Sequence, residues 1–336
     1  MKQIQNILII GGAGYVGSVL SKDLKDEGYS ITCIDNILYE DQQNNLDDNT
    51  QDSNFIKLDF RLTDKLKEYL VKSDCVILLG GLVGEFITKK YLTLSKSINE
   101  NGIKKIIDEI DNFKNIKNLI FVSTCSNYGV TESDNLVDEE HELKPLSPYA
   151  IAKVEIEKYI ISKKNTSYAP TILRFATAFG FSPRMRFDLT VNHFCYSLYK
   201  DKKIEVFDPD TWRPYCHVKD FSRLISRVIE VDRKLIDHQV FNVGSNENNF
   251  SKRQIASLIN KKLPSSNISY AKGGVDKRDY RVSFEKVFNI LNFKAKYSVE
   301  YGIEEILKLL ESKDLNYLKE DALKKRGNFQ ILDHVK

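Results

Sequence analysis

The sequence predicts an α/β protein with a doubly wound parallel sheet and a smaller C-terminal α/β lobe. Three observations support this fold class. Short apolar runs alternate with helical periodicity through the first half of the chain, a glycine-rich turn follows the first run, and the pattern becomes irregular after Gly180. Alternation of strands and helices is typical of a parallel sheet that is covered by helices on both faces.

Seven apolar runs are predicted to be strands of this sheet. Each is short and apolar on consecutive residues, as expected for strands buried on both faces. The runs are Ile7–Ile10, Ile31–Ile34, Phe55–Leu58, Cys75–Leu79, Leu119–Val122, Thr171–Phe175 and Gln239–Val243. The last of them follows the irregular region, and we expect it to rejoin the sheet. Helical periodicity runs from Tyr15 to Glu27, and further helices are predicted near residues 149–161 and 189–199.

The composition is that of an ordinary globular protein. Of the 336 residues, 42% are hydrophobic and 29% are charged, and the net charge of +3 comes from interleaved acidic and basic residues. This pattern predicts neither a nucleic-acid nor a membrane partner. No stretch reaches the ~18 apolar residues of a membrane span, and the N-terminus lacks the layout of a signal peptide. Five dispersed cysteines indicate reduced thiols in a cytoplasmic protein, and no cysteine or histidine has metal-ligand spacing.

A glycine-rich turn directly follows the first predicted strand. Gly11, Gly14 and Gly17 lack a Cβ, so backbone N–H groups there can approach a pyrophosphate at the start of the next helix. Asp35 closes the second strand about 20 residues later, where a carboxylate accepts hydrogen bonds from the adenosine ribose and repels a 2′-phosphate. The motif therefore predicts a Rossmann-type site for NAD rather than NADP. The alternative is a structural turn with a surface aspartate.

Tyr149 and Lys153 are predicted to be a proton-transfer pair. They are four residues apart in a helical pattern that begins at Pro148, so they share one face of the helix. A nearby ammonium stabilises a phenolate and is expected to lower the pKa of the tyrosine from ~10. Such a phenol can remove a proton from a hydroxyl as hydride moves to nicotinamide. The spacing alone is common, and its position after five strands and a dinucleotide turn makes it informative.

Hydroxyl side chains follow the fifth predicted strand. Thr124 and Ser126 lie at the carboxyl end of a parallel sheet, where ligands bind in such folds. Thr124 is therefore predicted to hydrogen-bond the reacting oxygen, and Ser126 is a second candidate. The alternative for both residues is an ordinary strand-end turn of small polar residues.

Together these motifs resemble the extended short-chain dehydrogenase/reductase family, in particular its nucleotide-sugar epimerases and dehydratases. The resemblance covers nearly the whole chain and matches Thr124, Tyr149 and Lys153 to catalytic positions. It implies NAD as cofactor, a nucleotide-diphosphate sugar as substrate, and a homodimer formed through residues 149–161 and 87–110. The cofactor contacts that it adds to the glycines, Asp35 and the catalytic pair are Tyr15, Val16, Asn36, Asp59, Phe60, Leu79, Gly80, Gly81, Asn99, Ser123, Phe175 and Thr177.

The same resemblance implies contacts to the sugar nucleotide. Arg213 lies in a segment like the family's Arg-x-Tyr-x-His-Val-x-Asp, and Arg278 is a second arginine for the diphosphate. Guanidiniums suit this role because each presents paired donors, although either arginine could instead form a surface ion pair. The full set of implied substrate contacts is Val83, Thr124, Ser126, Arg186, Asn192, Arg213 and Arg278.

These assignments divide the chain into three parts. Residues 1–178 are predicted to form the dinucleotide-binding Rossmann domain, to which residues 219–244 return. Residues 179–218 and 245–315 are predicted to form the nucleotide-sugar lobe. The charged tail, residues 316–336, is predicted to be a loose helix or partly disordered.

Two departures from the family pattern narrow the predicted reaction. The family's dehydratases carry an Asp-Glu pair directly after the catalytic threonine, whereas residues 125–126 are Cys-Ser here, so we expect no 4,6-dehydration. Many 4-epimerases read Arg-Tyr-Phe-Asn after the sixth strand, whereas residues 174–177 read Arg-Phe-Ala-Thr. The runs at residues 182–186 and 276–280 are similar to a subgroup from bacterial surface-polysaccharide pathways. Its nearest members are the GDP-manno-heptose 4-dehydrogenases of capsule synthesis.

The predicted reaction is NAD-dependent oxidation at C4 of a nucleotide-linked sugar. Tyr149 would remove the hydroxyl proton, and Thr124 would stabilise the charge that develops on the oxygen. Lys153 would hold the tyrosine ionised and bind the nicotinamide ribose. A 4-epimerase or a 4-keto reductase shares this half-reaction and stays an alternative. A non-catalytic NAD-binding regulator is a more distant one, because such proteins usually lose the tyrosine or the lysine.

Overall fold

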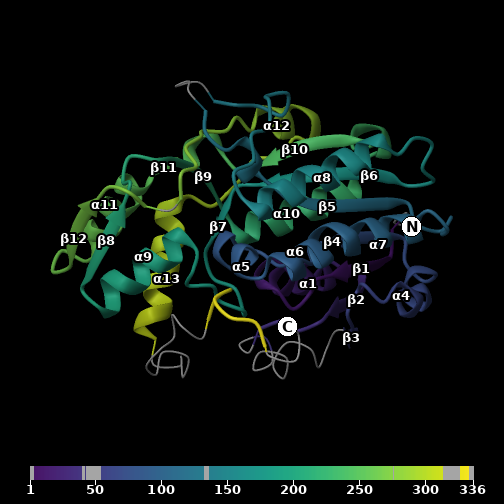
Figure 1. Ribbon diagram of the computed structural model, residues 1–336, viewed down its shortest axis with the longest axis horizontal. Coiled ribbons are helices and arrows are strands. Elements are labelled where there is room, and N and C mark those ends of the chain that lie inside the picture. The colour runs from purple at the N-terminus through teal and green to yellow at the C-terminus, as the bar shows by residue number, and fades with distance from the viewer. Residues whose placement is uncertain are drawn as a thin grey trace.

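A seven-stranded parallel sheet forms the centre of the protein, as a computed structural model shows (Figure 1). The structure describes residues 4–39, 42, 54–131, 136–274, 276–312 and 326–332. The strands are β1 (Asn6–Ile10), β2 (Ser30–Asp35), β3 (Asn54–Lys57), β4 (Cys75–Leu78), β5 (Asn118–Thr124), β6 (Ala169–Phe175) and β10 (Gln239–Val243). Their order is β10-β6-β5-β4-β1-β2-β3, so the chain reverses direction across the sheet between β1 and β4. The predicted fold class is confirmed.

Helices cover both faces because the strands are apolar on both sides. In β1, Ile7 and Ile9 pack on one face, while Leu8 and Ile10 pack on the other. The first face carries α1 (Tyr15–Asp26), α10 (Val218–Glu230) and α12 (Glu285–Leu291). The second carries α4 (Thr63–Leu70), α7 (Ile103–Ile110) and α8 (Pro148–Ser162). Each fully buried aliphatic side chain stabilises the fold by about 1.5–3 kcal/mol. A slip of one residue would move the side chains of a strand to the opposite faces, so the packing of these two cores fixes the register of the sheet.

Short helical segments connect the larger elements. Between β4 and α7 the chain forms α5 (Glu85–Lys90), α6 (Leu92–Lys96) and the π-helical η1 (Ser97–Gly102). Three 3₁₀ turns are η2 (Cys125–Tyr128), η3 (Arg233–Leu235) and η4 (Asn246–Asn248). The turn η2 follows β5 directly, so it brings residues 124–126 to the carboxyl end of the sheet.

A smaller α/β lobe lies beside the carboxyl end of the sheet (Figure 1). One of its sheets contains β7 (Thr177–Phe179), β9 (Trp212–His217) and β11 (Asn249–Ser251), and the other contains β8 (Lys203–Phe207) and β12 (Asn267–Ala271). Its helices are α9 (Thr190–Lys200), α11 (Lys252–Lys262) and α13 (Val299–Glu311), which share a separate apolar core. Tyr15 and Val19 of α1 belong to this core too, so the lobe is packed against the first helix of the main sheet.

The chain crosses between these two parts more than once. After the first lobe strands, α10 packs beside α1 and β10 pairs with β6 in parallel register. Residues 218–243 therefore lie with the main sheet. The exact division into domains at the ranges given above stays a prediction.

A buried ion pair ties α8 to β6. The guanidinium of Arg174 contacts both carboxylate oxygens of Glu157, at 2.8 Å from Nη2 to Oε2 and 3.2 Å from Nε to Oε1. Both side chains are about 95% buried, with exposures of 6% and 5%. Asn127 donates to Glu157 at 2.7 Å, and the Ser123 hydroxyl also donates to this carboxylate. The network joins β5, η2, α8 and β6 directly beneath the residues that follow β5.

The C-terminal segment 326–332 differs from the sequence prediction. A loose helix or disorder is expected there, but this segment is irregular and packs against the main sheet's side of the molecule, where Figure 1 draws it in yellow. Ile331 is 1% exposed and joins the core that contains Leu38 and Tyr39. The difference arises because apolar side chains such as Ile331 hold the segment in place, although they follow no helical or strand periodicity in the sequence. Residues 316–325 and 333–336 of the predicted tail lie outside the described residues.

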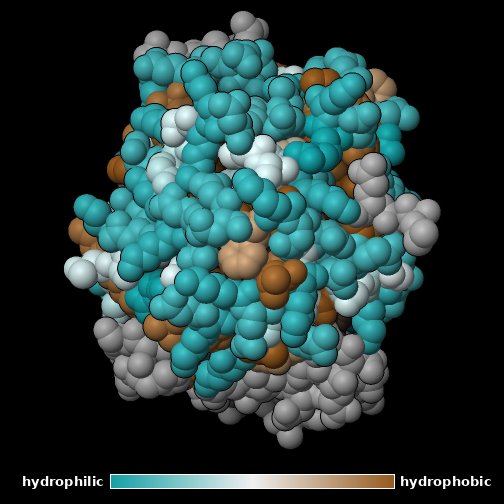
Figure 2. Space-filling view, turned by 90° about the vertical axis from the view of Figure 1, so that its right-hand side faces the viewer, coloured by the Kyte–Doolittle hydropathy of each residue, from teal (hydrophilic) through white to brown (hydrophobic). Residues whose placement is uncertain are grey.

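Among the described residues, no helix is both long and apolar enough to cross a bilayer. Figure 2 views the end of the molecule that carries α4 and α7 and shows a mainly hydrophilic face with apolar side chains only in small groups. Scattered apolar residues of this kind are usual on protein surfaces.

Candidate active site

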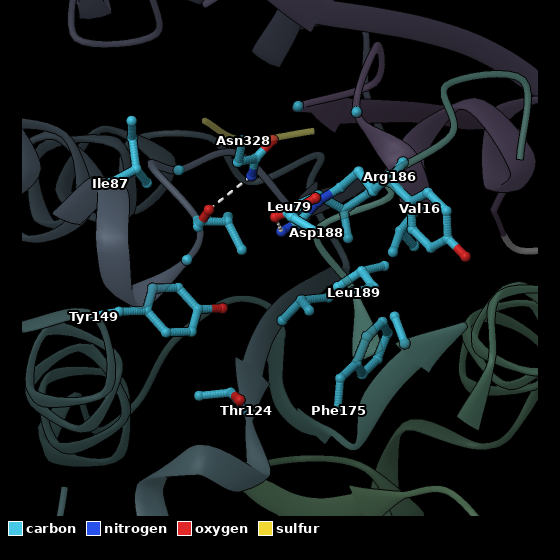
Figure 3. Close-up of a pocket in the computed structure, with 18 of the residues that line it drawn as sticks. Val16, Leu79, Ile87, Thr124, Tyr149, Phe175, Arg186, Asp188, Leu189 and Asn328 are labelled. Atoms are coloured by element: carbon cyan, nitrogen blue, oxygen red, sulfur yellow. Dashed lines mark hydrogen bonds and ion pairs between the residues drawn. The ribbon is translucent and has the colours of Figure 1, made fainter. Parts of the chain in front are cut away.

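A cavity of about 710 Å³ opens at the carboxyl end of the main sheet, between the sheet and the lobe. It lies where the strand order reverses, which is the ligand-binding position of doubly wound sheets. Its size is within the usual range for a cofactor or substrate site. Figure 3 shows side chains from α1, from the ends of β5 and β6, from the start of α8 and from residues 186–189 converging on it.

The glycine turn allows two backbone segments to approach each other at the base of the cavity. Gly11 has φ +93°, and a Cβ on it would lie 2.5 Å from the backbone nitrogen of Gly80. A Cβ on Gly17 would lie 2.4 Å from the carbonyl oxygen of Gly11. Gly14 begins α1 without a side-chain cap, and the first turn carries no acidic residue. The free N–H groups of this helix end therefore suit an anion such as the diphosphate of NAD.

Asp35 provides the carboxylate expected at the end of β2. It lines the cavity and accepts the N–H of Ala13 at 3.1 Å and of Ile37 at 2.9 Å. Burial raises the pKa of Asp35, and these N–H groups and the charge of Arg184 oppose the rise. Because the carboxylate is held beside the turn, it can accept hydrogen bonds from a ribose. These features fit NAD, which would supply a hydride acceptor at the other end of the cavity.

Tyr149 projects into the cavity from the start of α8. Ser147 caps this helix, accepting the N–H of Ala150 at 3.2 Å, and Pro148 occupies its first turn. Figure 3 shows the Tyr149 hydroxyl directed into the cavity, with Thr124 on the same side. Thr124 Oγ1 accepts the N–H of Ser126 at 3.1 Å, which fixes its hydroxyl at the end of β5. A substrate hydroxyl placed between these side chains could give its proton to the ionised form of Tyr149, the phenolate.

Lys153 lies one helical turn behind Tyr149. Its ammonium donates to the carbonyl of Val122 at 2.7 Å and lies 5.9 Å from the centre of the Tyr149 ring. Burial lowers the pKa of Lys153 to about 8, and raises the pKa of Tyr149 to about 12. The charges that act to lower the pKa of Tyr149 are those of Arg186 and Arg278. The ammonium of Lys153 is directed to the backbone of β5, and its expected effect on the pKa of Tyr149 stays a prediction.

The buried ammonium predicts a measurable pH dependence of stability. The pKa of Lys153 falls from its usual 10.5 to about 8 in the folded protein, so the charged form is penalised by folding. Between these two pH values the unfolded chain binds more protons than the native one, so stability rises with pH. Below pH 8 the penalty is about 3 kcal/mol.

We expect Lys153→Met to be more stable than the wild type at pH 7, with the difference shrinking as pH rises from 8 to 10.5. Urea unfolding of both proteins across this range measures it. Taking the difference cancels all other groups that titrate there. A stability difference that does not change with pH would contradict the assigned pKa.

Two arginines line the lobe side of the cavity, and two carboxylates contact them. Asp276 binds Arg278 through two contacts of 2.8 Å and lies 3.0 Å from Arg213. Arg278 also donates to the Ser126 hydroxyl at 2.5 Å and lies 2.9 Å from Glu85. The cluster therefore links the end of β5 to the lobe. Its guanidiniums can present paired donors to a second phosphate group.

Arg186 forms a further charged pair in the cavity wall. It binds both carboxylate oxygens of Asp188, at 3.0 and 2.5 Å. Figure 3 shows this pair near Asn328 and across the cavity from Tyr149. Burial alone would raise the pKa of Asp188, but Arg186 holds it below the usual value. The carboxylate therefore stays charged and keeps the guanidinium in place.

Comparison with known proteins places these features in a family. Residues 7–244 match the NAD dependent epimerase/dehydratase family. This chain belongs to that family. Its dependence on NAD confirms the predicted cofactor.

Relatives in this epimerase/dehydratase family extend over most of the chain. An uncharacterized protein of Methanocaldococcus jannaschii is 28% identical over 326 residues, which cover 92% of this chain and 98% of the relative. A UDP-glucuronate 4-epimerase of Thermodesulfobacterium geofontis is 24% identical, covering 88% and 93%. The crystal structure of a UDP-glucuronic acid 4-epimerase from Bacillus cereus, in complex with UDP-glucuronic acid and NAD, is 25% identical, with a TM-score of 0.79 and coverage of 91% and 100%.

Most residues predicted for the site of this epimerase/dehydratase line the cavity. For the cofactor and the reaction they are Gly11, Gly14, Tyr15, Val16, Gly17, Asp35, Asn36, Asp59, Phe60, Leu79, Gly80, Gly81, Ser123, Thr124, Tyr149, Lys153, Phe175 and Thr177. For the substrate they are Val83, Ser126, Arg186, Arg213 and Arg278. Lining the cavity makes contact possible, and the individual roles stay predictions.

Two residues predicted to contact the cofactor or the substrate bind nearby backbone in the structure. Asn192 is fully buried, and its amide accepts the N–H of Gly180 at 3.1 Å and donates to the carbonyl of Arg186 at 3.0 Å. Asn99 lies behind the Leu79–Val83 segment and makes two hydrogen bonds to the backbone of Leu82, at 2.8 and 2.9 Å. Neither side chain lines the cavity. A buried amide needs hydrogen-bond partners in the protein. Both amides find them in the backbone of neighbouring loops that line the cavity, and so hold those loops in position.

Several cavity residues are missing from the sequence prediction. Among them are Tyr39, Glu85, Arg184, His193, Lys252, Tyr280, Asn328 and Phe329. Arg184 lies two residues before Arg186 in the Ser182–Arg186 run, so its positive charge beside a predicted substrate contact could have marked it as a cavity residue. Asn328 and Phe329 have none, since only tertiary packing brings the C-terminal segment to the cavity.

The position after Thr124 clarifies what chemistry the cavity can perform. The Cys125 thiol is 1% exposed and donates to the carbonyl of Arg174 at 3.2 Å, so it faces away from the cavity. Ser126 faces the cavity, but Arg278 holds its hydroxyl. No acid–base pair therefore follows Thr124 on η2. Within the described ranges, no three His, Cys, Asp or Glu side chains are grouped so that they could bind a metal ion.

Proposed function

We propose that this protein removes hydride from C4 of a nucleotide-linked sugar, with NAD as the acceptor. One observation carries the proposal: a phenol, a hydroxyl and a buried lysine line one end of the cavity, and two arginines line its lobe side. Tyr149, as the phenolate, would take the proton of the C4 hydroxyl of the sugar as the C4–H bond gives its hydride to NAD. Thr124 would donate a hydrogen bond to the same oxygen and hold it during the transfer.

The lobe supports a nucleotide diphosphate as the other half of the substrate. Arg213 is 3% exposed and Arg278 is held by Asp276, so both guanidiniums keep fixed positions. Fixed, paired donors suit a diphosphate, because they bind it without first losing side-chain freedom. The relatives include proteins named as UDP-glucuronate 4-epimerases, which fits this class of substrate.

Two outcomes are compatible with this first step. The runs at residues 182–186 and 276–280 favour a 4-dehydrogenase of a GDP-linked heptose in surface-polysaccharide synthesis, in which the ketone is released. The named relatives favour a 4-epimerase, in which the ketone turns and receives hydride on its other face. Cys125 and Ser126, which follow Thr124, do not provide an acid–base pair for the elimination of water from the sugar.

A panel of GDP-, UDP- and dTDP-sugars incubated with the purified protein tests the proposal. Accumulating NADH, followed by absorbance, identifies the dehydrogenase. A changed C4 configuration in the NMR spectrum without NADH identifies the epimerase. Absence of hydride transfer with every sugar, while the protein binds NAD, would contradict the proposal and favour the regulator.

Glu85 supports a neutral sugar rather than a sugar acid. Its carboxylate lines the cavity and lies 2.9 Å from Arg278, which in turn donates to Ser126 beside Thr124. Arg278 already binds Asp276, so it has limited capacity to neutralise another negative charge. A carboxylate on the sugar would therefore be repelled at this end of the cavity.

We expect Glu85→Gln to raise kcat/KM for a nucleotide uronate, relative to the matching neutral sugar, by about tenfold or more. Steady-state kinetics with the two sugars on the same nucleotide measures this ratio. Glu68→Gln, at an exposed position of α4, is the control and should leave it unchanged. An unchanged ratio in Glu85→Gln would remove Glu85 from sugar recognition.

A homodimer is part of the proposal. Exposed apolar side chains, among them Leu92, Ile151 and Ile161, lie on α6 and α8, which are in contact with each other. These helices fall within the two regions predicted for the dimer. Adjacent exposed apolar residues favour burial against a second copy of the same surface.

A further inference from the structure

The C-terminal segment 326–332 forms one wall of the NAD cavity. The N–H of Phe187 donates to the carbonyl of Arg326 at 2.9 Å, and the N–H of Leu332 donates to the carbonyl of Leu38 at 2.9 Å. The segment is therefore fastened to the lobe at one end and to the chain after β2 at the other. Ile331 anchors it in the core of the sheet. Between these anchors, Asn328 and Phe329 face the cavity.

Asn328 connects two other parts of the cavity wall. Its Nδ2 donates to the carbonyl of Val83 at 2.6 Å, a bond that Figure 3 marks with a dashed line. Its Oδ1 accepts from Nη2 of Arg184 at 3.0 Å. The side chain is 6% exposed, so water competes little for these bonds. One amide therefore sets the position of the Arg184 guanidinium relative to the segment that follows β4.

Arg184 is a buried cation directed at the cofactor end of the cavity. It is 3% exposed, lines the cavity, and lies 4.7 Å above the ring of Tyr39. Burial acts to raise the pKa values of Asp35 and Asp188, and the charge of Arg184 acts to lower both. Arg184 is therefore within electrostatic reach of Asp35, the carboxylate that also accepts the Ala13 N–H of the glycine turn.

We propose that Arg184, oriented by Asn328 and by the face of Tyr39, binds the diphosphate of NAD across from the glycine turn. The N–H groups at the start of α1 would contact one side of the diphosphate, and the guanidinium would contact the other. The C-terminal segment thus becomes part of the cofactor site.

A cofactor held from both sides leaves slowly. Release of NAD would require Arg184 to lose its anion and the segment 326–332 to loosen its backbone bonds, and changes of this kind act mainly on dissociation rates. A retained cofactor suits an enzyme that returns hydride to its substrate, so the inference favours the 4-epimerase outcome. The diphosphate contact itself depends only on NAD binding, and it would survive a failure to find the sugar.

Calorimetric titration of the full-length, NAD-free protein with NAD and with adenosine tests the contact. Arg184→Gln should weaken NAD about tenfold to a hundredfold, the usual loss for a hydrogen bond to a charged group, and leave adenosine binding unchanged. Arg253→Gln, on exposed α11, is the control and should bind both as the wild type does. Wild-type NAD affinity in Arg184→Gln, or an equal loss for adenosine, would overturn the proposal.

The role of the segment is tested by the rate at which bound NAD dissociates. Asn328→Ala should release NAD several-fold faster, because Arg184 loses the bond that orients it. Gln330→Ala changes an exposed residue two positions away and should release NAD at the wild-type rate. Equal rates for Asn328→Ala and the wild type would show that the segment takes no part in holding the cofactor.

Discussion

Replacing Tyr149 with phenylalanine should reduce turnover by about a hundredfold to ten-thousandfold while NAD binding stays at the wild-type level. The variant keeps the ring that lines the cavity and removes only the hydroxyl that Figure 3 shows inside it. Without that oxygen, no group at this position can take the proton of the sugar hydroxyl. Steady-state kinetics with the sugar selected from the panel measures the loss, and calorimetry measures the affinity for NAD.

Tyr159→Phe is the matched control for this experiment. Tyr159 lies on the same helix, but its hydroxyl donates to Asp108 at the surface, far from the chemistry assigned to α8's first turn. We expect its kcat to stay close to the wild-type value. Full turnover by Tyr149→Phe would show that another group removes the proton. Loss of NAD binding by the same variant would show that the tyrosine is needed for the cofactor.

The second large effect concerns stability. Arg174→Met should lower the free energy of unfolding by about 3–5 kcal/mol, because it leaves the carboxylate of Glu157 buried without its cation. Two remaining donors, Asn127 and Ser123, still contact that carboxylate but carry no charge. Urea unfolding of the wild type and the variant measures the difference.

An exposed ion pair and a double variant separate the causes. Arg253→Met removes a pair with Asp210 whose side chains are exposed, and it should cost less than about 1 kcal/mol. Adding Glu157→Gln to Arg174→Met removes the unpaired charge and should restore part of the lost stability. A loss of less than about 1 kcal/mol in Arg174→Met would show that the buried pair adds little over its own desolvation.

The parts of the site that lie in short, continuous motifs could be predicted from the sequence. Gly11, Gly14 and Gly17 belong to one turn, and Tyr149 and Lys153 belong to one helix. The spacing of each set along the chain therefore determines the relative positions of its residues. The seven strands could also be predicted from the sequence, because strands that are buried on both faces consist of consecutive apolar residues. Local geometry and burial together explain the agreement.

Side-chain direction and long-range packing explain what the sequence could not show. Asn99 and Asn192 lie at the expected places along the chain, but their amides turn toward nearby backbone instead of the cavity. The ammonium of Lys153 turns toward the carbonyl of Val122, a direction that the spacing of Tyr149 and Lys153 does not determine. Asn328 reaches the cavity only because residues far apart in the chain fasten its segment in place.

The position of that segment also sets an order of events during synthesis. The glycine turn and Asp35 are made before Asn328 and Phe329, which complete the cavity wall. Domains generally fold as they emerge, at about 5–20 residues per second. The strands that precede this segment can therefore begin to fold while the cavity is still open on the side that Asn328 and Phe329 later close.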